Sequence, residues 1–494
     1  MKLKTTSRQD KENMYFCGKF FSILMESSFE HNETDLKALL ERFEEMVRSD
    51  GAYFFDVEDL EDIVDYYLDN QNLVKAKKAI DLAEAQHPGS TVFQLKKARY
   101  LILSEKTGKA ISLLEEIEKI DPTNPDIYML KGSILSRLKK YDEAIGEYHR
   151  ALFYSGDSED IYNSIAFEYE NAGNYDKAAE YLVRILEINP DNEAVIFELS
   201  FCYEITDNLE GAVDFLTQFL DRYPYNKIAW FNLGIAYNNL ELFERAIEAY
   251  EFAIAIDERF SSAYFNLGNA YANMGEYRLS IKNYKEALKY EEPQALTYYY
   301  IGECYEKLDR FPDAIQYYRL ALEIDPALAE AWMGLGVCLD ETGDPHTAAR
   351  HMERALDLED DNAENWYIYG DLKYKLNDKE AAVRAFEKVS ALDPMHSDIW
   401  LDLADIYLET GEMTKAFDTL EEGIFQQPKN ASLLYRMSSL LFRNGKQKQG
   451  LAVLSEGLET DFDKHSDLFE FAPELEQNRD VQELIQLHYN KMHN

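Results

Sequence analysis

Residues 227–260 read KIAWFNLGIAYNNLELFERAIEAYEFAIAIDERF, and this 34-residue pattern recurs without insertion or deletion from Val57 to Lys464. That stretch holds twelve units. A fixed period of this length is typical of a solenoid, in which each unit buries its apolar face against its neighbours. We number the places of each unit from 1 to 34, so that Lys227 is at place 1.

Apolar side chains recur at helical spacing twice in each unit. In the unit that begins at Lys227 they occupy places 4, 7, 8 and 11, and then places 20, 24 and 27. The sequence therefore predicts two helices per unit. Small residues at places 8 and 20 predict the points of closest approach between these helices, with aromatic rings filling the space around them. Place 8 is glycine at Gly132, Gly234, Gly268, Gly302, Gly336 and Gly370.

The turns agree with this period. Place 15 is glycine in five units, which predicts a left-handed residue at the end of the first helix. Asn124 before Pro125 is typical of a helix N-cap followed by proline at the first helical position. Prolines also follow the second helices, which they cannot continue.

These offsets resemble those of the tetratricopeptide repeat (TPR) family over about four fifths of the chain. The resemblance implies an all-α fold, a right-handed superhelical solenoid of about twelve TPR helical hairpins with capping helices at both ends. We expect an N-terminal tail and capping helices at 1–56, twelve tandem units at 57–464 and a C-terminal capping helix at 465–494. Apolar stripes at Leu36–Val47 and Val481–His488 indicate these caps, although either end could instead be a docking peptide.

Composition narrows the range of functions. The formal charge of −42 repels a phosphate backbone, so nucleic acid is not an expected partner, and it favours a basic protein through electrostatic steering. The interpretation of this charge as a solvated outer surface remains open. No segment is typical of a secretory signal or of a membrane span, and we therefore expect a cytoplasmic protein without a membrane partner.

The chain carries no sequence pattern that indicates an enzyme, a metal site or a cofactor. Its histidines are scattered, and no phosphate-binding glycine loop or calcium loop occurs. Three of the four cysteines, Cys202, Cys304 and Cys338, occupy place 10, where they are expected to be small core residues with free thiols. Free thiols suit a reducing compartment.

In the TPR family the first helices line a concave groove. Places 2, 5, 9 and 12 would face it here, and in the middle of the chain they become apolar. We interpret this aromatic tract as the candidate peptide site, although rings at place 5 could equally well pack between neighbouring first helices. The candidate aromatic residues are Phe167, Phe197, Phe201, Phe231, Phe265 and Tyr299.

Asparagines extend the candidate site. Asn232 and Asn266 share place 6 in consecutive units, and Asn269 follows the second of them. An amide can donate to and accept from a peptide backbone at once, and the placement resembles the asparagine ladder with which some TPR arrays hold extended chains. Ordinary solvated asparagines remain the alternative. No unit has Lys or Arg at place 2 or 5, and Lys96 and Arg436 at place 6 stand alone, which disfavours a grip on acidic C-termini.

These observations predict a non-enzymatic protein–protein interaction scaffold. It would hold an extended or helical segment of a partner, basic overall and with apolar side chains, in the groove of residues 159–340. The alternative is a structural subunit that self-associates or assembles into a larger complex. The sequence indicates neither the identity of the partner nor the oligomeric state.

Overall fold

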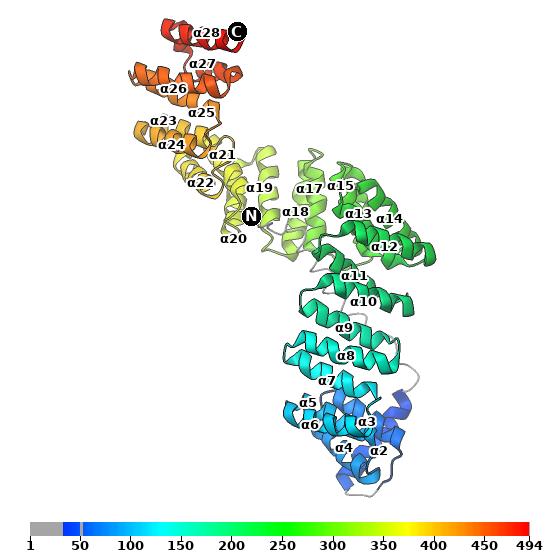
Figure 1. Cartoon of the computed structure of the whole chain (residues 1–494). Helices are drawn as coiled ribbons and strands as arrows, with labels where there is room; N and C mark the ends of the chain where they lie inside the picture. Colours follow the sequence, from blue (N-terminus) through cyan, green and yellow to red (C-terminus); the bar gives the residue numbers. More distant parts are fainter. Residues whose placement is uncertain (1–32, 50–52, 494) are drawn as a thin grey trace. The chain divides into compact units, whose positions relative to one another are not determined.

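The structure is a computed structural model that describes residues 33–49 and 53–493. The described residues form helices joined by short turns, and the predicted all-α TPR solenoid is confirmed. The chain divides into two units, residues 1–266 (unit 1) and 267–494 (unit 2), with the boundary inside α15. Figure 1 shows that, within each unit, helices adjacent in sequence stack side by side as hairpins.

The first helix of each repeat begins at place 1 in every repeat except the one at α23, where it begins two residues later. The first helices are α3 (Val57–Asp69), α5 (Thr91–Leu103), α7 (Pro125–Arg137), α9 (Glu159–Asn171), α11 (Glu193–Ile205), α13 (Lys227–Asn239), α15 (Ser261–Asn273), α17 (Ala295–Glu306), α19 (Ala329–Glu341), α21 (Ala363–Lys375), α23 (Ile399–Glu409) and α25 (Ala431–Arg443).

The second helix begins at place 17 in all twelve repeats. The second helices are α4 (Leu73–Gln86), α6 (Thr107–Ile120), α8 (Tyr141–Ser155), α10 (Tyr175–Ile188), α12 (Leu209–Arg222), α14 (Phe243–Ile256), α16 (Tyr277–Ala287), α18 (Phe311–Ile324), α20 (Pro345–Leu358), α22 (Lys379–Leu392), α24 (Met413–Gln426) and α26 (Gln447–Thr460).

Both ends of the repeat tract carry additional helices. At the start, α2 (Glu33–Ser49) buries Phe43 and Met46 in the cluster around α3, whereas Val47 of the predicted stripe is exposed. At the other end, η2 (Phe462–Ser466), α27 (Asp467–Phe471) and η3 (Pro473–Gln477) lead to α28 (Arg479–His493), which packs on α26. Val481 and His488 of α28 are buried, as a cap requires. The predicted capping role of residues 14–29 lies outside the described residues.

Close contact between glycine at place 8 and the side chain at place 24 joins the two helices of a hairpin. A Cβ atom added to Gly234 would lie 2.5 Å from Cε1 of Tyr250, and one added to Gly268 would lie 2.6 Å from Cε1 of Tyr284. Both rings are almost completely buried. The ring therefore lies flat on the backbone of the first helix, and any larger residue at place 8 would have to displace it.

The turn between the two helices has a left-handed residue at place 15 in all twelve repeats. Five of these residues are glycine, at Gly173, Gly275, Gly343, Gly411 and Gly445. The other seven carry side chains at φ values of 53–61°: Gln71, Glu105, Lys139, Asp207, Glu241, Asp309 and Asn377. An L-residue in this conformation costs about 1–2 kcal/mol, so the helical hairpin imposes the turn even where the sequence opposes it.

A polar contact at place 4 anchors the loop that enters several repeats. The indole Nε1 of Trp230 donates to the carbonyl oxygen of Pro224 at 2.8 Å, and that of Trp400 donates to Pro394 at 2.9 Å. The hydroxyl of Tyr128 makes the equivalent bond to Pro122 at 2.6 Å. Each donor bonds a carbonyl six residues earlier, in the loop two residues beyond the end of the preceding second helix.

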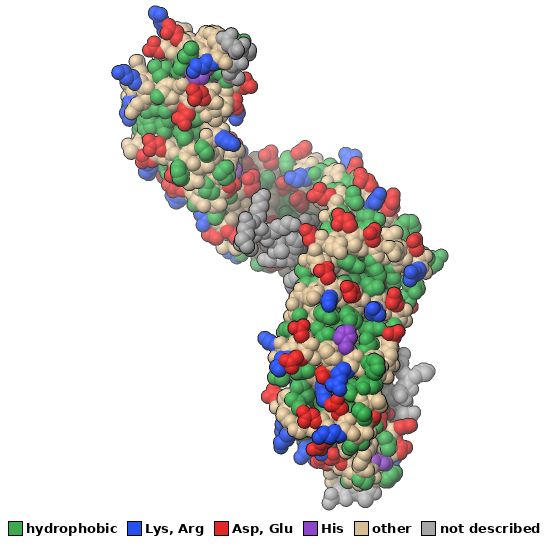
Figure 2. All heavy atoms as spheres, in the orientation of Figure 1, with side chains coloured by type: hydrophobic (Ala, Val, Ile, Leu, Met, Phe, Trp, Pro, Cys, Tyr) green, Lys and Arg blue, Asp and Glu red, His purple; other side chains and the backbone are tan. Residues whose placement is uncertain are grey.

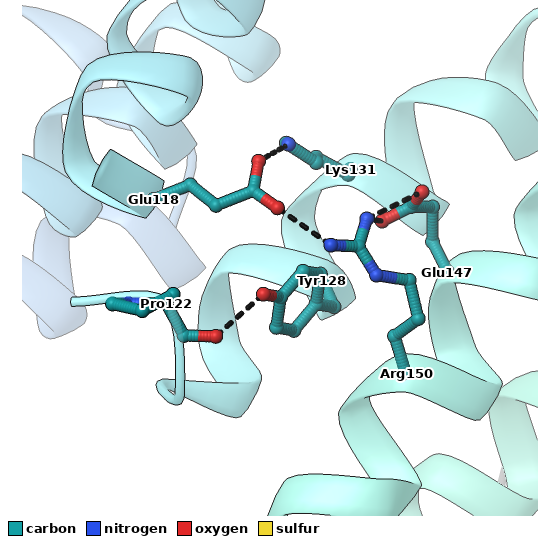
Figure 3. Close-up of polar contacts among 6 residues, drawn as sticks. All are labelled: Glu118, Pro122, Tyr128, Lys131, Glu147 and Arg150. Carbon is teal, nitrogen blue, oxygen red and sulfur yellow. Dashed lines mark hydrogen bonds and ion pairs between the residues drawn. The ribbon is translucent and has the colours of Figure 1, made fainter. Parts of the chain in front are cut away.

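An ionic network in unit 1 ties three consecutive helices together. Glu118 of α6 pairs with Lys131 of α7, and its other oxygen lies 2.6 Å from Nη2 of Arg150 on α8 (Figure 3). The same guanidinium pairs with Glu147 at 3.1 Å and lies over the ring of Tyr128, 4.2 Å from its centre. The hydrogen bond from Lys131 and the bond from Arg150 lower the pKa of Glu118. This network supplements the apolar packing between repeats.

Replacing Gly268 with alanine should destabilise unit 2, because the new methyl group must displace the buried ring of Tyr284. We expect a loss of about 1–3 kcal/mol, measured as a lower midpoint of chemical unfolding. Gly146 is the matched control. It lies within α8, and a Cβ there meets nothing within 4 Å, so Gly146→Ala should raise stability by about 0.5–1 kcal/mol. Equal effects at the two positions would contradict the contact.

Replacing Glu241 with glycine should stabilise unit 1, because Glu241 has a φ of 59° at place 15. Removing the left-handed strain stabilises the folded chain by more than the flexibility of glycine stabilises the unfolded chain. The free energy of unfolding should therefore rise by about 0.5–1 kcal/mol. The reciprocal change, Gly343→Ala in unit 2, should destabilise, since that glycine has a φ of 87°. Thermal unfolding followed by circular dichroism would check both, and a destabilised Glu241→Gly chain would refute the strain argument.

Candidate interaction surface

Two adjacent first helices of unit 1, α9 and α11, combine carboxylates with aromatic rings and carry no basic residue. Helix α9 contains four Asp or Glu residues and α11 contains three, with no Lys or Arg in either. On the sides of these helices that bear places 5, 6, 9 and 12, carboxylates and phenylalanines alternate. We call this set of residues the acidic aromatic face: Phe167, Glu170, Phe197, Glu198 and Phe201.

The rings of this face differ in accessibility. Phe167 has 53% of its surface exposed, whereas Phe197 and Phe201 are half-buried. Phe201 meets the ring of Tyr175 edge-on at 6.1 Å, and Phe197 contacts the ring of Phe231 at 6.2 Å. The half-buried rings are thus held in place by neighbours, while Phe167 projects from α9. An exposed phenylalanine beside fixed rings is suited to binding an apolar side chain.

Between these rings, the carboxyl groups of Glu170 and Glu198 meet. The Cys202 thiol of α11 donates to Glu170 at 3.4 Å, and Glu198, one helical turn before Cys202, lies close enough for the charge of Glu170 to act on it. Burial, and then the charge of Glu170, raise the pKa of Glu198 to about 7. Burial also raises the pKa of Glu170 and of the Cys202 thiol. The Glu198 carboxyl therefore holds its proton below about pH 7 and loses it above that pH.

In two other places, the corresponding sides of successive first helices bring a basic and an acidic side chain together. Lys96 of α5 pairs with Asp65 of the preceding first helix at 2.5 Å, and Arg436 of α25 pairs with Asp405 of α23 at 2.5 Å. The two basic residues at place 6 are therefore tied to place 9 of the preceding repeat. Between α9 and α11 the residue at place 6 is Glu198, an acid. Among the described residues, no Lys or Arg contributes to the pKa shift of its carboxyl group.

The structure separates the nine predicted site residues into groups. Phe167, Phe197 and Phe201 belong to the acidic aromatic face. Phe231 and Asn232 are core residues with exposed fractions of 6% and 3%. Phe231 packs on Tyr250 and Phe260, and it also contacts Phe197 of the preceding first helix, the kind of contact that the alternative interpretation of place 5 described.

The asparagines of the proposed ladder bond to their own chain. The Nδ2 groups of Asn232 and Asn266 donate to Ile228 and Ser262, one helical turn earlier, at 2.8 and 2.9 Å. Asn269 accepts from the hydroxyl of Tyr284 at 2.6 Å. The amides therefore already hold partners, and their role in binding a peptide stays a prediction.

Phe265 and Tyr299 are half-buried. The ring of Tyr299 packs on Tyr300 and on Tyr318, with ring centres 5.3 and 5.8 Å apart. Phe265 lies in unit 1 and Tyr299 in unit 2, and each remains a prediction for its own unit.

The Glu170–Glu198 pair was not among the residues predicted from the sequence. Glu170 is at place 12 of one repeat and Glu198 at place 6 of the next, and only the packing of α9 against α11 brings them together. The feature of the sequence that could have indicated this pair is the lack of any Lys or Arg in two consecutive first helices. Aspartates farther along serve the fold, since Asp402 accepts from Tyr367 at 2.8 Å and Asp405 binds Arg436.

Figure 2 shows Asp and Glu side chains over both units, with hydrophobic side chains between them. In residues 33–49 and 53–493, no group of three or more His, Cys, Asp or Glu side chains could hold a metal ion. Within the same ranges, none of the helices has the length and apolar character needed to cross a lipid bilayer. The cysteines of the described part, Cys202, Cys304 and Cys338, are buried free thiols, as predicted.

Comparison with known families identifies the repeat. Four profiles described as "Tetratricopeptide repeat" match this chain, at residues 125–152, 171–233, 228–260, 265–329, 329–362 and 370–431. The chain belongs to the tetratricopeptide repeat family. No curated protein matches its sequence.

Among solved structures, the chain is similar to YrrB, described as a TPR protein with an unusual peptide-binding site. The two share 21% identity over 40% of this chain and 97% of YrrB, with a TM-score of 0.33. The chain is also similar to a chain of the APC/C hetero-tetramer Cut9–Hcn1. The identity is 17% over 85% of this chain and 94% of the matched chain, and the TM-score is 0.38. The chain is also similar to MamA, with 25% identity over 34% of this chain and 97% of MamA and a TM-score of 0.31.

Membership of this family makes the chain a protein-interaction scaffold in the general sense, with another protein as its partner. Repeats of this kind are typically non-catalytic. The partner is recognised by whatever side chains the individual repeats present, since the fold alone does not select it.

The Glu170–Glu198 pair should make the stability of unit 1 depend on pH near neutrality. The pKa of Glu198 is raised to about 7 from 4.5, so the folded chain holds a proton that the unfolded chain releases. Stability is then greatest below pH 4.5 and falls as pH rises towards 7. In Glu198→Gln the side-chain amide can still donate towards Glu170 but cannot ionise. We therefore expect the decrease in the free energy of unfolding with rising pH to be smaller by roughly 1 kcal/mol.

Urea unfolding midpoints between pH 5 and pH 8 would measure this difference. Glu180→Gln is the matched control, because Glu180 is an exposed residue on the neighbouring helix α10. Parallel pH profiles for the wild-type chain and Glu198→Gln would show that Glu198 does not hold this proton.

Proposed function

We propose that this chain is a non-enzymatic scaffold that binds an extended basic segment of a partner protein on the acidic aromatic face of unit 1. The bound segment would combine Lys or Arg with aromatic or aliphatic side chains. One observation carries the proposal: Glu170 and Glu198 come together between α9 and α11, two helices that carry Phe167, Phe197 and Phe201 and have no Lys or Arg. At two other steps the chain supplies the cation itself, as Lys96 and as Arg436, whereas here the cation would come from the partner.

The carboxyl pair favours a cationic side chain on electrostatic grounds. A lysine or arginine placed between Glu170 and Glu198 would release the proton of Glu198 and form two charge-assisted hydrogen bonds. Such bonds are stronger than neutral ones, and the partly buried position limits screening by salt. Binding at this point would therefore be tighter above pH 7, where Glu198 has already lost its proton.

The rings supply the second part of the contact. Phe167 is exposed, and Phe201 is held edge-on against Tyr175, so both offer apolar area at little entropic cost. An aromatic face also attracts a cation that lies over it. Alternating basic and apolar side chains of an extended segment would contact carboxylates and rings in turn.

The charge of the whole chain supports a protein rather than a nucleic acid as the ligand. With a net charge of −42, the surface attracts basic segments over a distance set by the ionic strength and repels phosphate backbones. We infer from the same charge that association is faster at low salt.

A panel of three labelled 12-residue peptides would test the proposal by fluorescence anisotropy. The first alternates Lys and Phe with Ser spacers, the second replaces each Lys with Glu, and the third replaces each Phe with Ser. We expect binding of the first peptide alone, weaker at high salt. In Phe167→Ala/Phe201→Ala we expect at least a ten-fold loss of affinity, because the rings that hold the apolar side chains are gone.

Phe153→Ala is the control for this loss. Phe153 is 81% exposed on the second helix α8 of the same unit, away from the acidic aromatic face. Equal binding of the first and third peptides, or equal loss in Phe153→Ala and in the double variant, would overturn the proposed site. Circular dichroism of each variant separates lost binding from lost folding.

A further inference from the structure

We propose that residues 1–25 of this chain are a ligand of its own acidic aromatic face and compete there with the external partner. This inference rests on the proposed function, since it names an occupant of the same surface. Three observations support it: the charge of the segment, its aromatic content and its reach from the start of α2.

The charge of the segment is complementary to that of the face. Residues 1–25 contain five basic residues and two acidic ones, within a chain whose net charge is −42. This basic cluster is joined to a protein whose helices α9 and α11 carry carboxylates and no Lys or Arg. The basic residues of the segment are Lys2, Lys4, Arg8, Lys11 and Lys19.

The segment also provides aromatic side chains close to its basic ones. Tyr15 and Phe16 precede Lys19, which Phe20 and Phe21 follow. The stretch of residues 15–21 therefore has the composition that the acidic aromatic face would select, a lysine flanked by rings. Lys19 is the residue that we place between Glu170 and Glu198, with the neighbouring rings against Phe167 and Phe201.

The tether is long enough for this contact. Helix α2 begins at Glu33 and packs on α3, from which α9 is three first helices away. With a spacing of about 8–10 Å between successive first helices, α9 is about 24–30 Å and α11 about 32–40 Å from α3. The residues between Lys19 and Glu33 can span up to about 45 Å when extended. Residues 15–21 can therefore reach α9 and α11 of the same chain.

Covalent attachment makes even a weak contact effective. Covalent attachment through a segment of this length gives an effective concentration on the order of 1 mM. A segment with a dissociation constant of about 10 µM as a free peptide would then occupy the face about 99% of the time. An external partner would bind only by displacing it, so the segment would set a threshold for partner affinity or concentration.

The experiment compares the full chain with a chain that lacks residues 1–25, using a labelled peptide of residues 1–25 as the probe. All described helices lie after the deletion. We expect the peptide to bind the shortened chain at least ten-fold more tightly than the full chain, where the attached segment competes. In the shortened chain, Glu170→Gln/Glu198→Gln should weaken binding at least five-fold, because it removes both charges that hold Lys19.

Glu180→Gln/Asp214→Asn is the matched control, since it removes the same charge from exposed positions on the second helices α10 and α12. A peptide with its five basic residues changed to Glu should not bind. Equal affinity of the 1–25 peptide for both chains would overturn the inference. Concentration-dependent dimers of the full chain that disappear on deletion would also overturn it, in favour of a second copy as the occupant.

The test distinguishes failure of this inference from failure of the proposed function. If the Lys–Phe peptide binds the shortened chain and the 1–25 peptide does not, the proposed function stands and the segment is not a ligand. If neither peptide binds the shortened chain, the face itself is not a peptide site.

Mapping can use the thiol of Cys17. The other three cysteines are buried, so a benzophenone maleimide should label Cys17 selectively in the full chain. Illumination should then crosslink it to peptides from α9 and α11, and crosslinks confined to other helices would contradict the placement.

Discussion

The contact between a glycine at place 8 and a buried ring at place 24 is the constraint on which the repeat depends. Gly234 with Tyr250 and Gly268 with Tyr284 show that the ring lies where a Cβ atom would be. This contact sets the distance between the helices of a hairpin, and a constant distance lets successive hairpins stack with a constant period. It also explains why turns such as those at Glu241 and Asn377 accept a left-handed side chain. The turn conformation follows from the packing of the helices that it joins.

The sequence predicted this framework well because the spacing of its apolar and small residues recurs along twelve units. The start of nearly every helix and the glycine contacts follow from spacing alone, and so do the buried thiols. Prediction was weaker for single residues on the face of the first helices. Spacing placed Phe167 and Phe231 on the same side, but only one is exposed, because burial depends on the rings of adjacent helices. The Glu170–Glu198 pair depends on contact between two repeats, which a pattern within one repeat does not describe.

The acidic aromatic face differs in one respect from two other steps between first helices. Lys96 and Arg436 each form an ion pair with a carboxylate of the preceding first helix. These charges stabilise the stacking of the repeats and leave little charge for a partner to recognise. The pair of α9 and α11 has two carboxyls at the equivalent point, and the proton that Glu198 holds is a cost of folding at neutral pH. A stacked array tolerates such a local cost because its stability is a sum over many interfaces. Repeats that are locally poor in stability are therefore suited to binding.

The tryptophan hydrogen bonds have a consequence for spectroscopy. Trp230 is the single tryptophan of unit 1, whereas Trp332, Trp366 and Trp400 belong to unit 2. All four indoles donate to a carbonyl six residues earlier, so their surroundings are similar in the folded state. Loss of an indole bond at a loop exposes the ring to water and shifts its emission to longer wavelength. A chain that retains Trp230 alone would therefore report the melting of one half, and fluorescence could show whether the two halves unfold together.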